Sequence, residues 1–207
     1  MVHDDDDVPA PIDLRAPHDV ATWLETAETV RPWRPAIRRA IAELLRDHLA
    51  PPLTILELGP GAGLLAEVIL ATCTVTRYTL LDFSPPFLEL CRDRLGASGV
   101  AELVLADFKS PAWPSLVRPP YDAVVTMQAV HELRHKKHAA TLYTQVLPLL
   151  RPGGLIAICD HMPKGDPRST ALHASDLEQH EALATAGFTS ITTHLLDHAM
   201  YVCAARR

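Results

Sequence analysis

The feature that most constrains the fold of this chain is a glycine-rich turn that directly follows an apolar strand. Residues 54–58 are almost continuously apolar, as is typical of a parallel strand covered on both faces. Gly59, Gly61 and Gly63 follow at once and lead into an expected helix. Glycine adopts backbone angles closed to other residues and has no Cβ, so a ligand can lie directly against such a turn. Glu57, at the end of the strand, points a carboxylate at the same groove.

Two familiar glycine motifs do not fit this turn. The dinucleotide fingerprint places its third glycine one residue later, where this chain has Leu64. A phosphate-binding loop needs Gly-Lys followed by Ser or Thr, and no lysine follows Gly63. The turn therefore predicts a nucleotide pocket of another kind, in which an acid precedes the glycines.

The next strand is expected over residues 77–81 and ends at a second acid, Asp82. An acid about 20 residues past such a turn is suitably placed to bind the hydroxyl pair of a ribose. Ser84 then caps a helix that has Pro85 at its first position and closes at Gly96. Two successive strands thus each end in an acid, and this pattern favours a pocket at this edge of the sheet.

The remainder of the chain continues the alternation of strands and helices. Ser175 and Glu178 form a capping box that opens a helix ending near Gly187. The Leu-Arg-Pro-Gly-Gly turn of residues 150–154 separates a helix from a strand. We expect strands over residues 102–105, 121–127, 155–159, 189–196 and 199–205, and a helix over residues 139–150.

In their order, these motifs resemble those of the class I S-adenosylmethionine-dependent methyltransferases, in particular small bacterial-type domains. The Glu-x-Gly-x-Gly-x-Gly run is similar to motif I of that family, and the Leu-Arg-Pro-Gly-Gly turn is a further hallmark. The resemblance covers residues 53–207. It implies an α/β fold with a Rossmann-like, doubly wound, seven-stranded sheet, mostly parallel with an antiparallel last strand, and helices on both faces. It also implies S-adenosyl-L-methionine as the cofactor and S-adenosyl-L-homocysteine as the product.

The resemblance further implies which residues contact the cofactor. Glu57 and the three glycine backbones would surround the methionyl portion, Asp82 would bind the ribose, and Asp107 would receive the adenine amino group. The full set of expected cofactor contacts is Glu57, Gly59, Gly61, Gly63, Asp82, Phe83, Ala106, Asp107, Phe108 and Met127.

The expected chemistry is in-line displacement of a methyl group that the sulfonium already activates, so the protein chiefly positions the acceptor. A base is needed where the acceptor oxygen or nitrogen must lose a proton. His131 is the first candidate for it and His161 the second, since imidazole titrates near working pH. Both could instead be loop residues without a catalytic role. No metal is expected, because the metal-ligand set of catechol-type enzymes has no counterpart in this chain.

Residues 131–135 also match the His-Glu-x-x-His pattern of zinc peptidases. That site needs both imidazoles on one face of a helix, within a cleft unrelated to the glycine turn. Here the pattern follows the strand over residues 121–127, where the resembling family has a short apolar-His-x-Leu sequence. We therefore interpret His131 as a residue near the mouth of the pocket and residues 134–138 as a solvated basic turn.

The first third of the chain predicts a flexible acidic segment over residues 1–17 and helices within residues 18–50. In the resembling fold such helices cover the cleft of the domain formed by residues 51–207. Trp23 and Trp33 are therefore candidates for the acceptor pocket, together with Gln128 after the fourth strand. Packing of each tryptophan onto the sheet is an equally open alternative.

Composition narrows the function further. A net charge of −6 without a basic run argues against nucleic acid as a partner. The start has no signal-peptide pattern, and no apolar run reaches the ~18 residues of a membrane span, so we expect a cytoplasmic protein. The 4 scattered cysteines suit reduced thiols.

We expect a small-molecule methyl acceptor and a monomer or homodimer. Two alternatives stay open, namely aminopropyl transfer or cyclisation on the same fold and a non-catalytic cofactor-binding protein.

Overall fold

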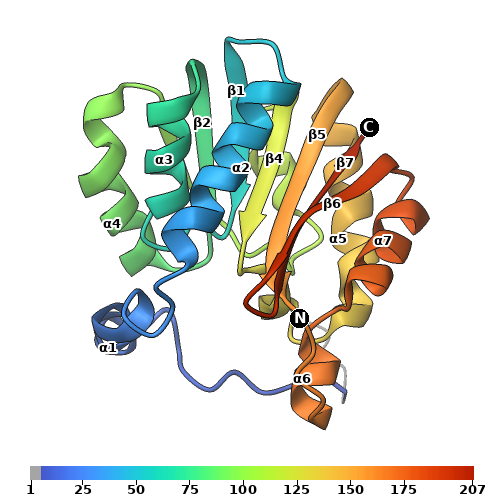
Figure 1. Cartoon of the computed structure of the whole chain (residues 1–207). Coiled ribbons are helices and arrows are strands. Elements are labelled where there is room, and N and C mark those ends of the chain that lie inside the picture. The colour runs from blue at the N-terminus through green and yellow to red at the C-terminus, as the bar shows by residue number, and fades with distance from the viewer. Residues whose placement is uncertain (1–5) are drawn as a thin grey trace.

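A computed structural model describes residues 6–207 and contains one mixed sheet of seven strands in the order β3-β2-β1-β4-β5-β7-β6 (Figure 1). The pairings from β3 across to β5 are parallel, and β7 runs antiparallel to both β5 and β6. This confirms the predicted doubly wound sheet. The strands are β1 Leu53–Leu58, β2 Val75–Asp82, β3 Ala101–Leu105, β4 Tyr121–Met127, β5 Leu150–His161, β6 Thr189–Asp197 and β7 Met200–Arg206.

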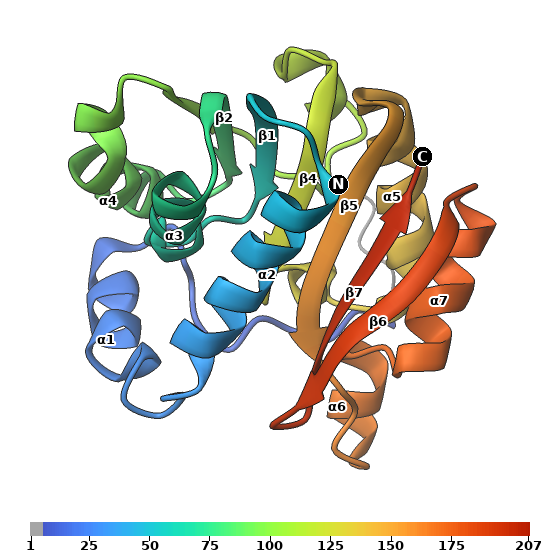
Figure 2. The ribbon, with the colours of Figure 1, turned by 45° about the horizontal axis from the view of Figure 1, so that its top comes forward.

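Helices cover both faces of the sheet and bury two apolar clusters. The cluster on one face joins the sheet to α2, α3 and α4, and the cluster on the other joins it to α5 and α7. Figure 2 shows α1 and α6 beyond the ends of the strands rather than on a face. The helices are α1 Pro17–Ala27, α2 Arg34–His48, α3 Leu64–Thr72, α4 Pro85–Leu95, α5 Ala139–Val146, α6 Pro167–Leu172 and α7 Asp176–Thr185. Over residues 6–207, every helix is too short or too polar to cross a membrane.

The element bounds follow local chemistry that the sequence shows in part. Ser84 accepts a hydrogen bond from the Phe87 amide at the start of α4, and the Ser175 and Glu178 capping box opens α7. These caps confirm two of the predicted helix starts. Because these caps satisfy amides that the first helical turn leaves free, they fix where each helix begins.

The transition from α5 to β5 differs from the prediction. The helix ends at Val146, and a single 3₁₀ turn over Leu147–Leu149 replaces its expected last turn. The Arg-Pro-Gly-Gly turn lies inside β5, because Tyr121 pairs with Leu150 whereas Ala123 pairs with Leu155. The turn is thus a bulge in a longer strand, and Gly153 adopts a left-handed φ of +76° within it.

The predicted flexible segment, residues 1–17, falls partly outside the described residues, which begin at Asp6. From there the chain lies against the loop that follows β4. The amide of Val8 donates to the carbonyl of Arg134 at 2.9 Å, and the Arg134 guanidinium donates to the carbonyls of Val8 and Pro9 at 2.8 and 2.9 Å. Arg134 is therefore buried, and its expected place in a solvated basic turn was wrong. Acids from other segments also pair with that turn, since Lys136 binds Glu178.

All four cysteines of the chain lie within the described residues and carry free thiols, as predicted. Cys91, Cys159 and Cys203 are buried in the two apolar clusters. They therefore act as small apolar side chains in the core.

Candidate functional site

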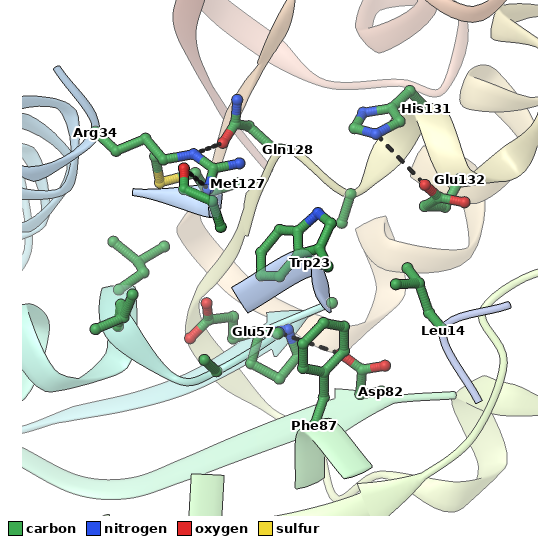
Figure 3. Close-up of a pocket in the computed structure, with 18 of the residues that line it drawn as sticks. Leu14, Trp23, Arg34, Glu57, Asp82, Phe87, Met127, Gln128, His131 and Glu132 are labelled. Atoms are coloured by element: carbon green, nitrogen blue, oxygen red, sulfur yellow. Dashed lines mark hydrogen bonds and ion pairs between the residues drawn. The ribbon is translucent and has the colours of Figure 1, made fainter. Parts of the chain in front are cut away.

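A pocket opens at the carboxyl ends of β1, β2 and β4, beneath α1 and the start of α2. It contains about 1110 Å³ of empty space, counted out to its open mouth. In Figure 3, Glu57 and Asp82 lie on one side, Gln128 and His131 lie across from them, and the ring of Trp23 stands between in this view. The N-terminal helices thus close a groove that the strand ends alone would leave open.

The glycine turn is shaped by contacts that exclude a side chain. Gly59 has a φ of +69°, and a Cβ added there would lie 2.4 Å from the Cβ of Ala129. Its amide donates to the carbonyl of Leu81 at 2.9 Å, which fastens the turn to β2. The turn therefore packs directly against the loop after β4. This close packing brings the two halves of the pocket wall together.

Glu57 is completely buried at the end of β1. Its Oε2 accepts a hydrogen bond from the hydroxyl of Tyr78 at 2.7 Å. Burial raises the pKa of Glu57 to about 7, although the Tyr78 hydrogen bond opposes that shift. The carboxyl group lines the pocket at the glycine turn.

Asp82 uses both carboxylate oxygens to order its surroundings. Oδ2 accepts from the amide of Gly61 at 3.2 Å, and Oδ1 accepts from the amide of Ser84 at 2.9 Å. Burial raises the pKa of Asp82 to about 6, against the lowering effect of these backbone hydrogen bonds. Asp82 therefore holds the turn and the start of α4 while it lines the pocket.

The N-terminal segment reaches the end of the pocket where the adenine is expected. The guanidinium of Arg15 lies 4.5 Å from the centre of the Phe83 ring, and its Nη2 is 3.2 Å from Oδ2 of Asp107. The hydroxyl of Ser84 donates to the carbonyl of Leu14. The Arg15 side chain thus contacts Asp107, the expected acceptor of the adenine amino group, and Phe83, another expected cofactor contact.

The opposite end of the pocket carries a chain of polar contacts. Arg34 is buried, and its Nε donates to Oε1 of Gln128 at 2.5 Å. The amide nitrogen of Gln128 lies 2.9 Å from Nε2 of His161 and donates to it. Gln128 has a left-handed φ of +56°, uncommon for a residue with a side chain, and such strained backbone concentrates at functional sites. The helix α2 is thereby tied to the loop after β4 and to the last residue of β5.

His131 forms a close pair with Asp160, the acid at the end of β5. The imidazole Nδ1 donates to Oδ1 of Asp160 at 2.8 Å, and the His131 amide donates to Oδ2 at 3.0 Å. Burial by itself lowers the pKa of His131, but the charge of Asp160 and the shared hydrogen bond outweigh it and raise that pKa. Burial likewise opposes ionisation of Asp160, yet the charge of His131 keeps its pKa low, at about 2. For His161, burial dominates and lowers the pKa to about 4.

The structure brings most of the predicted site residues to one pocket. Those that line it are Trp23, Glu57, Gly59, Gly61, Asp82, Phe83, Phe108, Met127, Gln128, His131 and His161. Those outside the lining are Trp33, Gly63, Ala106 and Asp107. The roles assigned to the individual residues stay predictions, because the structure contains no ligand.

Trp33 is a correction to the predicted acceptor pocket. Its indole nitrogen donates to the sulfur of Met200 at 3.4 Å, and its ring stacks on His198 with the ring centres 4.7 Å apart. It therefore fastens the start of α2 to β7 and to the turn that joins β6 to β7. Trp23, by contrast, lines the pocket and meets the ring of Phe87 edge to face at 5.4 Å.

Sequence reasoning missed several residues of the pocket. Arg34 and Arg38 line it from α2, and Glu28 and Arg31 line it from the connection between α1 and α2. No periodicity separates these arginines from solvated ones. Asp160 could have been found, since it is an acid at a strand end, the signal that drew attention to Glu57 and Asp82.

The His-Glu-x-x-His pattern does not build the helical face of a zinc peptidase. A 3₁₀ helix over Val130–Leu133 carries His131 and ends at Arg134, whose φ is +71°. His135 caps the next turn and accepts from the amide of Lys137 at 3.0 Å. The two histidines therefore lie on separate 3₁₀ turns divided by a left-handed residue.

Comparison with known proteins agrees with this fold. Residues 56–156 match a family model described as a methyltransferase domain. One curated relative, the hybrid PKS-NRPS synthetase lepA of Aspergillus flavus, is 31% identical over 117 residues, which make up 55% of this chain and 3% of the synthetase. The chain thus matches only a small part of that relative.

Among solved structures, human N-acetylserotonin methyltransferase in complex with SAM aligns at a TM-score of 0.71 and 17% identity, over 97% of this chain and 60% of that one. A putative O-methyltransferase from Nostoc punctiforme aligns at 0.71 and 17%, over 89% and 60%. The [4+2]-cyclase SpnF aligns at 0.64 and 16%, over 82% and 80%. Identities this low establish the shared fold, and two of these three proteins are much longer than the present chain.

Proposed function

We propose that this protein transfers a methyl group from S-adenosylmethionine to a small-molecule acceptor. The chain carries a methyltransferase domain of the class I fold, which supports this proposal. The reacting atom of the acceptor is an oxygen or a nitrogen. The observation that carries the proposal is one continuous pocket. It runs from the glycine turn, with Glu57 and Asp82, to the His131 and Asp160 pair. A cofactor held at the first end would present its methyl group to an acceptor at the second.

The arrangement supports in-line transfer by positioning. The sulfonium methyl is already activated, so the protein must hold the acceptor on its far side within attack distance. Such positioning can contribute roughly 7–11 kcal/mol of the barrier reduction. This transfer step needs no metal ion.

His131 is the proposed proton acceptor for an acceptor hydroxyl or ammonium group. Its Nδ1 is held by Asp160, so the ring is oriented and the imidazolium formed on proton uptake is stabilised. His161 is the second candidate. Because its Nε2 accepts from Gln128 and burial keeps its pKa near 4, it is the weaker base of the two.

A second use of the same cofactor is the main alternative. The similarity to the cyclase SpnF favours keeping it, since that protein shares the fold and is named for a different reaction. A protein that binds the cofactor without turnover is the other alternative. Product analysis separates all three, because S-adenosylhomocysteine forms only when a methyl group moves.

The test incubates the protein with isotopically labelled methyl donor and a fractionated metabolite extract, with a chelator present. We expect labelled acceptor and S-adenosylhomocysteine in equal amounts. His131→Ala should lower turnover about 10²-fold or more while calorimetric affinity for the cofactor stays unchanged. His180→Ala, on α7 outside the pocket lining, is the matched control. If the product formed from the cofactor still carries the methyl group, the reaction is not methyl transfer, and the alternative use of the cofactor takes its place.

The remaining properties are proposed from composition. The acidic net charge of −6 supports a small molecule rather than a nucleic acid as the partner. A cytoplasmic location and a monomeric or homodimeric state complete the proposal.

A further inference from the structure

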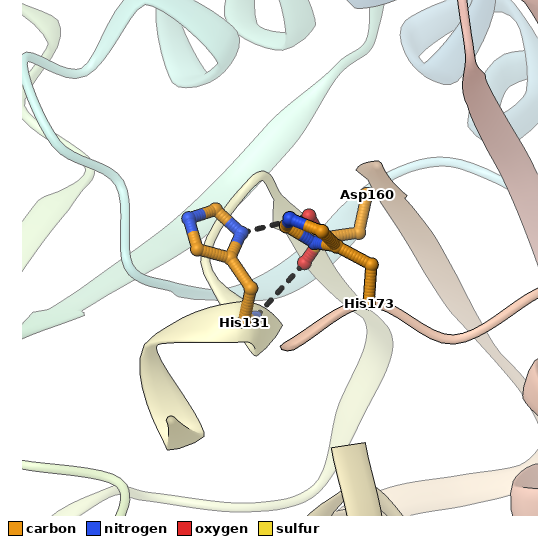
Figure 4. A group of neighbouring side chains, drawn as sticks. All are labelled: His131, Asp160 and His173. Atoms are coloured by element: carbon orange, nitrogen blue, oxygen red, sulfur yellow. Dashed lines mark hydrogen bonds and ion pairs between the residues drawn. The ribbon is translucent and has the colours of Figure 1, made fainter. Parts of the chain in front are cut away.

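Two histidines and a carboxylate converge where β5 ends, beside the acceptor end of the pocket. His131 lies in the 3₁₀ turn after β4, Asp160 lies in β5, and His173 is the C-cap residue of α6. Each offers one ligand atom, and these three atoms all lie within 4.8 Å of one another (Figure 4). No other group of three potential ligands in residues 6–207 comes this close.

His173 gives the cluster an atom without an assigned use. Its Nδ1 is buried and has no hydrogen-bond partner among the described residues. Its ring lies 5.4 Å from that of His131 and 5.3 Å from that of His161, centre to centre. Buried polar atoms nearly always have partners, so an orphaned nitrogen beside a carboxylate points to a group that the protein alone does not supply.

The donor atoms fit a transition-metal site. His131 and His173 each offer an imidazole nitrogen and Asp160 offers a carboxylate oxygen, and proteins bind such ions through these atom types. Clusters of carboxylates alone bind many different cations weakly, whereas two imidazoles with one carboxylate favour first-row transition metals.

We propose that His131, Asp160 and His173 bind one divalent transition-metal ion of the Zn²⁺ or Fe²⁺ type. Metal–ligand bonds of about 2.0–2.2 Å place the ligand atoms of one ion roughly 3.3 Å apart. His131 Nδ1 and Asp160 Oδ1 are now 2.8 Å apart across a hydrogen bond. The ion would take the place of the shared proton, and rotation of the His173 ring would bring its nitrogen into range.

The ion would have an open position toward the acceptor. Of the surrounding histidines, His131 and His161 line the pocket, whereas His173 is not part of the lining. Water or an acceptor oxygen can therefore complete the coordination. A His131 ring ligated through Nδ1 keeps its hydrogen on Nε2 and cannot accept a proton. The metal-free and metal-loaded proteins thus differ at the reacting end of the pocket, which is why the methyl-transfer assay above includes a chelator.

The experiment measures metal binding to the full-length protein without cofactor or acceptor. Chelator-treated protein is titrated with Zn²⁺ by calorimetry and with Co²⁺ by visible absorption, whose bands report ligand geometry. We expect one ion per chain. His173→Ala should weaken binding roughly 100-fold or more, because a direct ligand counts for at least as much as the residues that orient ligands.

His135→Ala is the matched control, since it removes the second histidine of the His-Glu-x-x-His pattern and leaves the cluster intact. Circular dichroism and cofactor affinity establish that both variants fold. Stoichiometric binding that His173→Ala loses and His135→Ala keeps supports the site. Absence of binding in the unaltered protein, or binding that His173→Ala leaves unchanged, overturns it, and neither result bears on methyl transfer.

Discussion

At the scale of single residues, the pocket contains two buried carboxyl groups whose pKa values lie close to neutral pH. Glu57 and Asp82 have pKa values of about 7 and about 6, raised by desolvation and not by any nearby anion of comparable effect. A bound cation would reverse this shift, because an opposite charge favours the ionised form. The protonation of the empty pocket and the charge of the cofactor are therefore linked.

This linkage predicts that affinity for S-adenosylmethionine depends on pH through Glu57. The free protein holds the proton below its pKa of about 7, and the sulfonium cofactor favours the carboxylate. Binding must release the proton at lower pH, so the Kd should fall as pH rises toward 7, up to about tenfold per unit, and level off above it. Calorimetry in buffers of different ionisation enthalpy measures both the affinity and the released proton.

Two comparisons make that prediction specific. S-adenosylhomocysteine lacks the sulfonium charge, so its Kd should change less over the same range. Glu57→Gln removes the titrating group and should flatten the dependence. An equal slope in Glu57→Gln would assign the proton to another group.

A second residue-scale prediction concerns Asp82. Asp82→Ala should weaken cofactor binding at least about tenfold, or roughly 1.4 kcal/mol, because it removes charge-assisted bonds to the ribose hydroxyls. Asp82→Asn separates this role from the structural one, since its amide oxygen can still accept from the Gly61 or Ser84 backbone. We expect Asp82→Asn to keep stability near that of the unaltered protein and still to lose affinity. Unchanged affinity in Asp82→Ala by calorimetry would reject the ribose assignment.

At the scale of elements, the glycine turn and the loop after β4 form one packed unit. Gly59 and Ala129 meet so closely that a Cβ at Gly59 would lie 2.4 Å from that of Ala129. The same loop carries Gln128 and His131. Movement of the glycine turn therefore displaces the acceptor end of the pocket as well as the cofactor end.

This packing predicts different outcomes for two glycines of one turn. Gly59→Ala should destabilise the protein by about 2–5 kcal/mol, the sum of a left-handed alanine and an overpacked contact. Gly61→Ala, where nothing lies within 4 Å of the added Cβ, should cost only the backbone part, about 1–2 kcal/mol. Denaturant unfolding of both variants measures the difference.

A compensating change checks the mechanism. Ala129→Gly in the Gly59→Ala background removes the contacting Cβ and should recover the overpacking part alone. If the double variant is no more stable than Gly59→Ala alone, the contact with Ala129 is not the source of the lost stability.

Elements were predictable from the sequence where one short stretch contains all the relevant chemistry. The apolar run of β1, the acids at strand ends and the Ser175 capping box each need only a few adjacent residues. The bulge in β5 was missed because it depends on the pairing of Tyr121 and Ala123 with a distant strand. The approach of His173 to Asp160 was missed for the same reason, since the path of the chain after β5 leaves no periodic signal.

At the scale of the whole molecule, residues far apart in sequence decide how the pocket is covered. The chain from Val8 to Arg15 crosses the loop after β4, through its bonds to Arg134, and ends on Phe83 and Asp107. Composition predicted a flexible acidic segment over residues 1–17. It could not show that backbone carbonyls of the segment would satisfy a buried arginine.

The position of Arg15 predicts competition with the adenine. Arg15→Ala removes a cation–π contact and a half-exposed ion pair, worth about 1 kcal/mol together, and should tighten cofactor binding about fivefold. Calorimetry measures the effect, and Arg39→Ala on the exposed side of α2 serves as the control. Weaker binding in Arg15→Ala would mean that Arg15 covers the bound adenine and does not have to leave it.

The antiparallel strand β7 lies between β5 and β6, although it is the last of the three in the chain. During synthesis on the ribosome, β5 therefore exposes an unpaired edge until Met200–Arg206 has emerged. An exposed edge of this kind is a template for pairing with another nascent chain. Chaperones that shield open β-edges would accordingly matter most for this protein between the emergence of β5 and the emergence of β7.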